Sequence, residues 1–197
     1  MSSKLISFIR RKVVRIDKYR WDYQYSSGLW DGLRTEEMQR LNVARGFLNK
    51  YTLGGNILEI GCGEGIFFKN TLGVDYAFYE GIDLSEVAIS RIQKTEKSLF
   101  VSADMEKYMP RNNPFSIIVL NEVLYYSKNP LGLLKRYAQY LAKDGVFLIG
   151  MYDTKKSADI WISTSKVFSE LDSAKVQQDS KAWYYKILKM NQSNTVY

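Results

Sequence analysis

The fold is decided by residues 57–65, which read ILEIGCGEG. The first four residues are apolar except for Glu59, which is typical of a buried strand, and glycines stand at alternate positions in the second half. Glycine has no side chain to stop the backbone from turning sharply or from approaching a ligand closely. In open α/β sheets, ligands bind beyond the carboxyl ends of the strands. The stretch therefore predicts a first parallel strand that ends on a ligand-binding loop.

The glycine spacing argues against a nicotinamide dinucleotide as the ligand. A dinucleotide fingerprint, G-x-G-x-x-G, that starts at Gly61 needs its third glycine one position beyond Gly65. That position holds Ile66. A simple tight turn after a strand would show the same glycines, so the loop alone does not identify its ligand.

From this loop onward, short apolar runs alternate with helical segments, which is typical of βαβ units and of a mainly parallel sheet. We expect strands near residues 57–60, 78–83, 99–103, 116–121 and 145–152. We expect helices near residues 65–72, 85–95, 130–142 and 157–171, and an earlier one from a cap at Thr35 to Gly54. Asn129 and Pro130 mark one helix start clearly, as N-cap and first helical residue. Two closing strands, 175–179 and 182–189, must pair antiparallel because a tight connection joins them.

The composition fits one ordered enzyme domain. The 197 residues are 46% hydrophobic and include only 3 prolines, so the chain can bury a core of its own. Cys62 is the sole cysteine and histidine is absent, which excludes an internal disulfide and a Cys/His metal site. No apolar run is long enough to cross a bilayer and no secretory signal is visible. We therefore expect a soluble, cytoplasmic protein that uses no metal.

Positive charge is concentrated in an N-terminal arm. Residues 1–20 hold seven basic residues and one acidic residue, whereas the rest of the chain holds 21 basic and 20 acidic residues. A nearly neutral body lacks the basic face of a nucleic-acid enzyme, so nucleic acid is not the expected partner. The apolar residues of the arm share one side of a helix: Leu5, Phe8, Ile9, Val13 and Ile16. This amphipathic helix either packs on the body or on a second subunit, docks through residues 4–20 to an anionic membrane surface or an acidic partner, or is a cleaved targeting segment.

Two further strand ends carry groups that suit a nucleoside. Asp83 ends the second predicted strand, where a carboxylate can accept hydrogen bonds from both hydroxyls of a ribose. Asp104 follows the third, where it can accept from the exocyclic amino group of adenine while Met105 packs on the ring. An acid at a strand end is commonly only a helix cap. Three strand ends in this order, however, favour a single ligand that contains a nucleoside.

Four segments resemble the successive cofactor motifs of class I S-adenosylmethionine-dependent methyltransferases: ILEIGCGEG (57–65), YEGIDLS (79–85), VSADME (101–106) and FSIIVLNEVLYY (115–126). The resemblance covers about residues 35–190. It implies a Rossmann-like, doubly wound α/β sheet of seven strands, mostly parallel with an antiparallel last strand. It also implies S-adenosylmethionine as the cofactor, with S-adenosylhomocysteine as the product.

By the same resemblance, Glu59 and the glycines line the methionine side of the cofactor, Asp83 the ribose, and Asp104 with Met105 the adenine. The expected cofactor-binding residues are Glu59, Gly61, Cys62, Gly63, Asp83, Leu84, Asp104, Met105, Asn121 and Glu122. The aromatic stretch 21–31 shows neither helix nor strand periodicity, so we expect an ordered loop. Family members with an N-terminal cap imply that this loop is a lid over the cofactor. The expected lid and substrate contacts are Tyr23, Tyr25 and Trp30.

The segment NEVLYY (121–126) is where substrate and methyl group should meet. It is similar to the corresponding segment of nodulation protein S and related small-molecule methyltransferases, whose prototype methylates an amino group on a chitooligosaccharide, and it therefore points to a sugar. It does not resemble the Asn/Asp-Pro-Pro-aromatic motif of enzymes that methylate nucleobase or amide nitrogens. A hydroxyl acceptor would be helped by a general base, for which the candidates are Glu122, Asp153, Asp31 and the tyrosines. An amine acceptor needs only placement, which Tyr125 or Tyr126 could supply.

The sequence thus predicts a methyltransferase that acts on an O or N acceptor of a small molecule. The leading substrate class is a sugar, nucleotide-sugar or glycan intermediate, as in polysaccharide biosynthesis. The alternatives are an RNA or protein methyltransferase that uses the basic arm, and a noncatalytic cofactor-binding module of the same fold. The expected organisation is a basic arm with an aromatic cap at 1–34, a methyltransferase domain at 35–190 and a flexible tail at 191–197.

Overall fold

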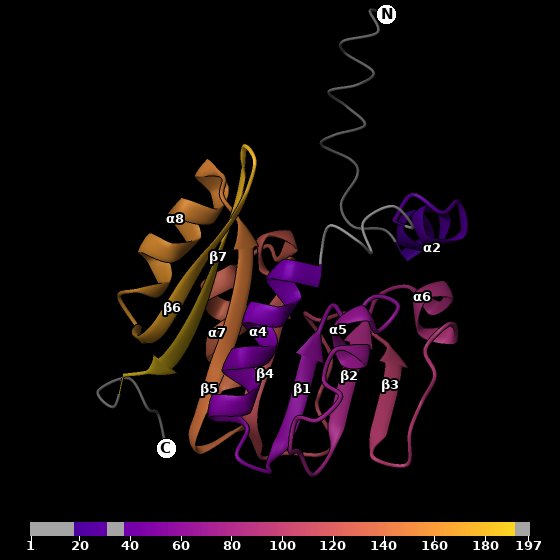
Figure 1. Ribbon diagram of the computed structural model, residues 1–197, viewed down its shortest axis with the longest axis horizontal. Helices are drawn as coiled ribbons and strands as arrows, with labels where there is room; N and C mark the ends of the chain where they lie inside the picture. Colours follow the sequence, from indigo (N-terminus) through magenta and orange to yellow (C-terminus); the bar gives the residue numbers. More distant parts are fainter. Residues whose placement is uncertain (1–17, 31–37, 192–197) are drawn as a thin grey trace, which may run out of the picture.

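Seven strands form one sheet in the order β3-β2-β1-β4-β5-β7-β6 (Figure 1). The structure is a computed structural model and describes residues 18–30 and 38–191. The strands are β1 (Asn56–Ile60), β2 (Tyr79–Asp83), β3 (Ser98–Ser102), β4 (Phe115–Asn121), β5 (Leu141–Tyr152), β6 (Phe168–Gln178) and β7 (Lys181–Met190). Strands β1 to β5 are parallel, and β7 is antiparallel to both of its neighbours. The predicted doubly wound sheet with an antiparallel last strand is confirmed, and its strand order reverses between β1 and β4.

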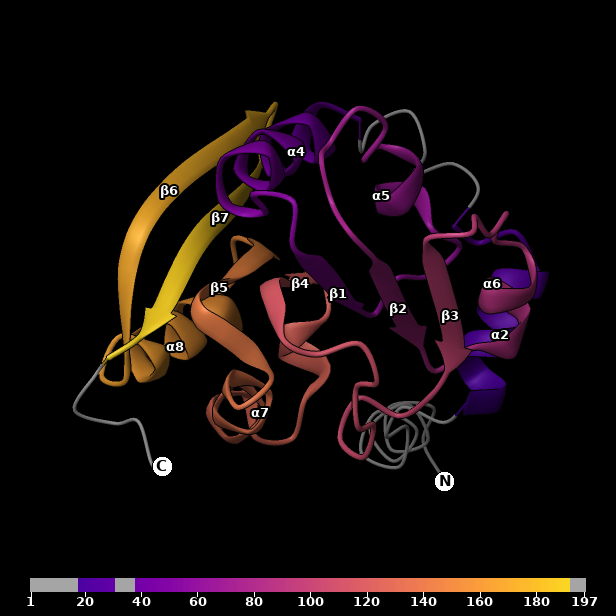
Figure 2. The same ribbon diagram turned by 90° about the horizontal axis from the view of Figure 1, so that it is seen from below.

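Helices cover both faces of the sheet, with α4 and α5 on one face and α7 and α8 on the other (Figure 2). Their bounds are α2 (Lys18–Ser26), α4 (Met38–Tyr51), α5 (Ile66–Lys69), α6 (Glu86–Ser90), α7 (Pro130–Ala138) and α8 (Lys155–Thr164), with a short 3₁₀ helix η1 (Leu124–Tyr126). In residues 18–30 and 38–191, no helix is long and apolar enough to cross a membrane.

The core has two layers because successive residues of a strand point to opposite faces. In β1, Ile57 packs under α4 and α5, whereas Leu58 packs with α7. Leu48 of α4 and Leu134 of α7 are fully buried in the two layers. Burial of one such side chain contributes about 1.5–3 kcal/mol, so the two layers hold the sheet rigid beneath the loops at its edge.

Polar side chains cap the first turns of three helices. The Asn129 side chain accepts a hydrogen bond from the Gly132 amide with Pro130 at the first helical position, which confirms the predicted start of α7. Ser85 caps α6 by accepting from the Ala88 amide, and Thr154 caps α8 by accepting from the Ser157 amide. These caps satisfy amides that a helix start otherwise leaves without partners.

The prediction of a loop over residues 21–31 is wrong for the first half of that range, because Lys18–Ser26 form the helix α2. Trp21 and Tyr25 lie one turn apart on this helix, and their rings are 6.3 Å apart. Asp22 anchors the helix to Ser85, which is 63 residues away in the sequence. Such a long-range contact overrides the weak helix propensity of aromatic residues, and it leaves no local signal.

The predicted helix over 157–171 ends seven residues early, at Thr164. Phe168 instead starts β6, where its ring packs against Phe147 at a centroid distance of 5.6 Å. The hairpin partner explains the difference, because β7 pairs with β6 along the whole of residues 168–178. Helices α5, α6 and α7 are also shorter than predicted, and β5 starts earlier, because Leu141 pairs with Phe115.

Several predictions lie outside the described residues. They are the amphipathic arm, the cap at Thr35, the possible base Asp31 and most of the tail. The predicted cytoplasmic location and membrane contact through residues 4–20 stay predictions. The proposed division at residues 34 and 190 stays a prediction as well.

Candidate functional site

A cavity of about 1330 Å³ lies at the carboxyl ends of the central strands. Most of the predicted site residues line it: Glu59, Gly61, Cys62, Gly63, Asp83, Leu84, Asp104, Met105, Asn121, Glu122, Tyr125, Tyr126, Tyr25 and Trp30. They meet because parallel strands end at the same edge of the sheet. The pairing of Ile60 with Ile82 sets the loop after β1 level with the end of β2.

Two predicted site residues need correction. Tyr23 is 71% exposed and does not line the cavity. It is two residues from Tyr25 on α2, and a helix turns residues at that spacing to different sides. Asp153 is also exposed and does not line the cavity, whereas its neighbours Tyr152 and Thr154 do.

The glycine loop requires glycine for two separate reasons. Gly61 and Gly63 have positive φ angles of 74° and 52°, which disfavour any residue with a Cβ atom. A Cβ atom on Gly61 would also lie 2.5 Å from Cγ2 of Val123. One on Gly63 would lie 2.8 Å from the hydroxyl of Tyr25 on α2. The glycines thus let the loop turn sharply while Val123 and Tyr25 pack directly against its backbone.

Asp83 is held in place by two backbone amides. Its Oδ2 accepts from the Gly63 amide and its Oδ1 from the Ser85 amide, both at 2.9 Å. Burial raises the pKa of Asp83, and the two amides partly offset this effect. Each carboxylate oxygen has a second lone pair, so the group can still accept from two vicinal hydroxyls.

Glu59 is the most deeply buried acid on the cavity wall. It is 2% exposed and accepts a 2.5 Å hydrogen bond from the Tyr79 hydroxyl. Burial raises its pKa from 4.5 to about 7, with the hydrogen bond from Tyr79 acting against the shift and the charge of Asp83 adding to it. Glu59 therefore exchanges its proton near neutral pH, and a cation beside it would favour the ionised form.

We expect the free energy of unfolding of the protein without cofactor to decrease as pH rises, because of Glu59. The folded state binds the proton of Glu59 more tightly than the unfolded chain, so its contribution is complete below pH 4.5 and is lost as pH rises through about 7. The full loss amounts to about 3 kcal/mol. Urea unfolding at a series of pH values should show this slope in the native chain but not in Glu59→Gln. Parallel pH profiles of the two proteins would contradict the assigned pKa.

Hydrogen bonds from α7 fix the loop that carries Asp104 and Met105. Tyr137 donates a 3.0 Å hydrogen bond to the Met105 carbonyl, and Arg136 donates to the same oxygen. Asp104 accepts from the Glu106 amide at 2.9 Å. The Asp104 carboxylate thus keeps a defined position on the cavity wall.

Glu122 follows β4 in an unusual conformation. Its φ is 58°, in the left-handed region, and its amide donates to the Gly150 carbonyl at 2.8 Å. The Tyr125 hydroxyl donates to Glu122 Oε2 at 3.0 Å. Burial, followed by the charge of Glu122, raises the pKa of Tyr125, so this hydroxyl stays a donor at neutral pH. Strained backbone of this kind is concentrated at functional sites.

Sequence reasoning missed Arg40 of α4. Its side chain is buried, and Nη1 donates to Asn121 Oδ1 at 3.1 Å and to the Tyr185 hydroxyl at 3.2 Å. The signal was present, because Arg40 precedes Ala44 and Phe47 on the predicted buried face at helical spacing. An arginine in an apolar stripe needs polar partners, and Asn121 at the end of β4 supplies one of them.

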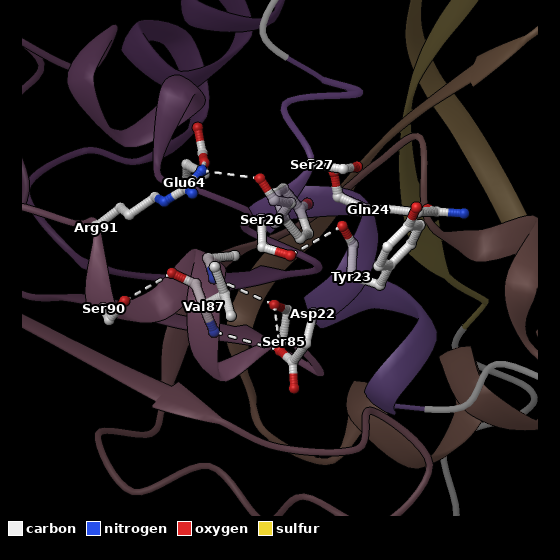
Figure 3. Close-up of polar contacts among 12 residues, drawn as sticks. Asp22, Tyr23, Gln24, Ser26, Ser27, Glu64, Ser85, Val87, Ser90 and Arg91 are labelled. Atoms are coloured by element: carbon white, nitrogen blue, oxygen red, sulfur yellow. Dashed lines mark hydrogen bonds and ion pairs between the residues drawn. The ribbon is translucent and has the colours of Figure 1, made fainter.

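Helix α2 covers one side of the cavity and is attached to α6 (Figure 3). Asp22 Oδ1 accepts from the Ser85 hydroxyl at 2.6 Å and from the Val87 amide at 3.3 Å. Arg91 donates to the Tyr25 carbonyl at 3.0 Å and pairs with Glu64 beside the glycine loop. These contacts hold Trp21, Tyr25 and Trp30 on the wall of the cavity, where a lid over the cofactor is predicted.

Comparison with known proteins identifies similar chains. Malonyl-(acyl-carrier protein) O-methyltransferase 2 of Ilyobacter polytropus is 29% identical over 147 residues, which are 68% of this chain and 55% of that protein. A methyltransferase of Leishmania major superposes with a TM-score of 0.68 at 15% identity, over 83% of this chain and 76% of that one. The N-methyltransferase NodS of Bradyrhizobium japonicum, in complex with S-adenosyl-L-homocysteine, has a TM-score of 0.62 at 18% identity, over 75% and 86% of the two chains.

The structural neighbours share the fold of this chain. The chain spans about half the length of the curated relative from Ilyobacter. The methyltransferase domain family matches residues 34–188, which is most of the chain. The glycine loop, the acids at the strand ends and the reversed strand order described above agree with this match. The chain belongs to the methyltransferase domain family.

Proposed function

We propose that this protein transfers a methyl group from S-adenosylmethionine to an O or N acceptor on a small molecule, with a sugar, nucleotide-sugar or glycan intermediate as the substrate class. One observation carries the proposal. Acids at or just after the ends of three successive strands, Glu59 of β1, Asp83 of β2 and Asp104 after β3, line one cavity. Membership of the methyltransferase domain family supports the methyl transfer.

The residues of the cavity fit the cofactor. Glu59 with the glycine loop would hold the methionine part, Asp83 the ribose hydroxyls, and Asp104 with Met105 the adenine. Glycine at positions 61 and 63 lets Val123 and Tyr25 pack directly on the loop that lines the cavity. Acids also suit a ligand that carries a positive sulfonium and an ammonium group.

When bound, S-adenosylmethionine would supply a methyl group: an acceptor lone pair forms a bond to the methyl carbon in line with the breaking carbon–sulfur bond, the sulfur keeps the electrons of that bond and leaves as S-adenosylhomocysteine, and the acceptor loses a proton. Glu122 is the residue to receive that proton from a hydroxyl acceptor, and Tyr125 orients its carboxylate. An amine acceptor that arrives neutral needs placement only. The lid residues Trp21 and Trp30 exclude water from the reaction.

The sugar assignment draws on the aromatic residues at the acceptor side of the cavity. Tyr152 and Trp183 line it with their rings 5.3 Å apart, and Tyr126 lines it near Trp21. Flat aromatic faces with a polar edge suit the apolar faces and hydroxyls of a sugar ring. Similarity of residues 121–126 to the corresponding segment of NodS-type enzymes agrees with this substrate class.

The test is transfer of a labelled methyl group by the full chain to a panel of sugars, sugar phosphates, nucleotide-sugars and amines. We expect a labelled small molecule. For a hydroxyl acceptor, Glu122→Gln should lower kcat by about 10²–10⁴-fold while calorimetric affinity for S-adenosylhomocysteine stays within about twofold. Cofactor binding without transfer to any acceptor would indicate a noncatalytic module, and labelling of RNA or protein alone would exclude a small-molecule substrate.

A further inference from the structure

Arg40 and Tyr185 contact the side-chain amide of Asn121 at the end of β4. Helix α4 packs across β4, β5 and β7, and it carries Arg40 to the wall of the cavity. Arg40 Nη1 donates to Asn121 Oδ1 at 3.1 Å and to the Tyr185 hydroxyl at 3.2 Å. The Tyr185 hydroxyl donates in turn to Asn121 Oδ1 at 3.0 Å. Both donors therefore meet the same amide oxygen.

These contacts fix which way the amide of Asn121 is turned. A guanidinium group has donors and no acceptor, so the amide atom that faces Arg40 must be the oxygen and not the nitrogen. The Tyr185 hydroxyl accepts from Arg40, so its own hydrogen is directed to the same oxygen. Arg40 and Tyr185 are both buried, and a turned amide would place its N–H groups against these two donors. The observed orientation is therefore strongly favoured.

The nitrogen of the same amide is open to the cavity. Asn121 lines the cavity, and among the residues that the structure describes none accepts a hydrogen bond from its Nδ2. Nδ2 is also not one of the buried side-chain atoms that lack a partner, so solvent or a ligand can reach it. A ligand atom that binds at Nδ2 must accept a hydrogen bond.

The place of Asn121 in the sheet sets this donor beside the methionine part of the cofactor. Ile60 pairs with Leu120, so Gly61 and Asn121, which follow them, lie next to each other where β1 and β4 end. The glycine loop is assigned to the methionine part, which carries a sulfonium, an ammonium and a carboxylate group. Of these three groups, the carboxylate is the one that accepts hydrogen bonds. An ionised Glu59 on the same wall would repel the carboxylate, so it needs a donor of its own.

We propose that Asn121 binds the carboxylate of the methionine part through Nδ2, and that Arg40 and Tyr185 are positioning residues that hold the amide in the required orientation. The inference rests on the proposed function, since it gives Asn121 a defined role in the same cofactor site. Arg40 and Tyr185 act through Asn121, and neither needs to touch the cofactor. Residues of α4 and β7, which are far apart in the sequence, thus fix one cofactor contact.

Calorimetry on the full chain with two probes tests the inference. S-adenosylhomocysteine has the methionine carboxylate, whereas methylthioadenosine keeps the adenosine and the sulfur but lacks the amino-acid part. Asn121→Asp keeps an oxygen for Arg40 and Tyr185 and replaces the N–H donor by a second carboxylate oxygen. We expect this variant to bind S-adenosylhomocysteine at least about tenfold more weakly than the native chain, as loss of a charged hydrogen bond does. Its affinity for methylthioadenosine should stay close to the native value.

Tyr185→Phe tests the positioning role. Without the hydroxyl, the amide loses one of the two donors that fix it, so affinity for S-adenosylhomocysteine should fall by about three- to tenfold while that for methylthioadenosine does not change. In the Asn121→Ala background, which has no amide to orient, Tyr185→Phe should cause no further loss. The matched control is Tyr184→Phe, since this neighbouring residue of β7 points to the opposite face of the sheet. It should bind both probes like the native chain.

The outcomes separate the inference from the proposed function. A native chain that binds neither probe would overturn the proposed function itself. If Asn121→Asp keeps the native affinity for S-adenosylhomocysteine, or loses affinity equally for both probes, the contact with the carboxylate is wrong and the proposed function stands. An undiminished loss from Tyr185→Phe in the Asn121→Ala background would overturn the positioning role, because the hydroxyl would then act without the amide.

Discussion

We expect Asp83→Ala to weaken binding of S-adenosylhomocysteine about a hundredfold, because two hydrogen bonds between ribose hydroxyls and a charged group are lost. The Gly63 amide also loses its acceptor, so the glycine loop loses part of its support. Calorimetry on the native chain and the variant measures the effect. Asp83→Asn keeps one carbonyl acceptor and should lie between them.

The matched control for this experiment is Asp159→Ala, since Asp159 is an exposed acid on α8 that does not line the cavity. Its affinity for S-adenosylhomocysteine should equal that of the native chain. An Asp83→Ala variant that binds as tightly as the native chain would refute the ribose assignment.

The second large effect is expected for Gly61→Ala. The left-handed backbone at φ 74° costs a residue with Cβ about 1–2 kcal/mol. The new methyl group would lie 2.5 Å from Cγ2 of Val123, whose β-branched side chain has little freedom to move. Together these effects should lower the free energy of unfolding by about 2–4 kcal/mol and abolish cofactor binding. Urea unfolding gives the first quantity and calorimetry the second.

Two further variants test whether the loss of stability in Gly61→Ala comes from the contact with Val123 or from replacing any glycine by alanine. A Cβ atom on Gly46 of α4 meets nothing within 4 Å, so Gly46→Ala should raise stability by about 0.5–1 kcal/mol. Val123→Ala in the Gly61→Ala background should restore only part of the loss, because it removes the contact with Cγ2 but leaves Cβ of residue 123 at 2.8 Å from the new methyl group, and the backbone part stays. Native stability of Gly61→Ala would show that the loop is less constrained than its geometry indicates.

The central sheet was predictable because its signals are local. Residues 57–65 carry both the buried strand and the glycine loop, and Asn129 with Pro130 marks the start of α7. Asp83 and Asp104 were predicted correctly to lie at one edge of the sheet, since strand ends of a parallel sheet meet there. What these residues bind stays a prediction.

Other features depend on contacts that are distant in the sequence. Helix α2 forms against α6, through Asp22 and Ser85, and aromatic residues alone do not indicate it. The start of β6 at Phe168 depends on β7, because a helical spacing of apolar residues persists into the strand by coincidence.

A crystal structure of the full chain with S-adenosylhomocysteine measures the main assignment directly. Density is expected to extend over the carboxyl ends of β1, β2 and β3, with the ribose hydroxyls on Asp83, the adenine beside Met105 and the sulfur directed toward Glu122. A ligand bound elsewhere, or one bound in the cavity without contact to Asp83, would contradict the account.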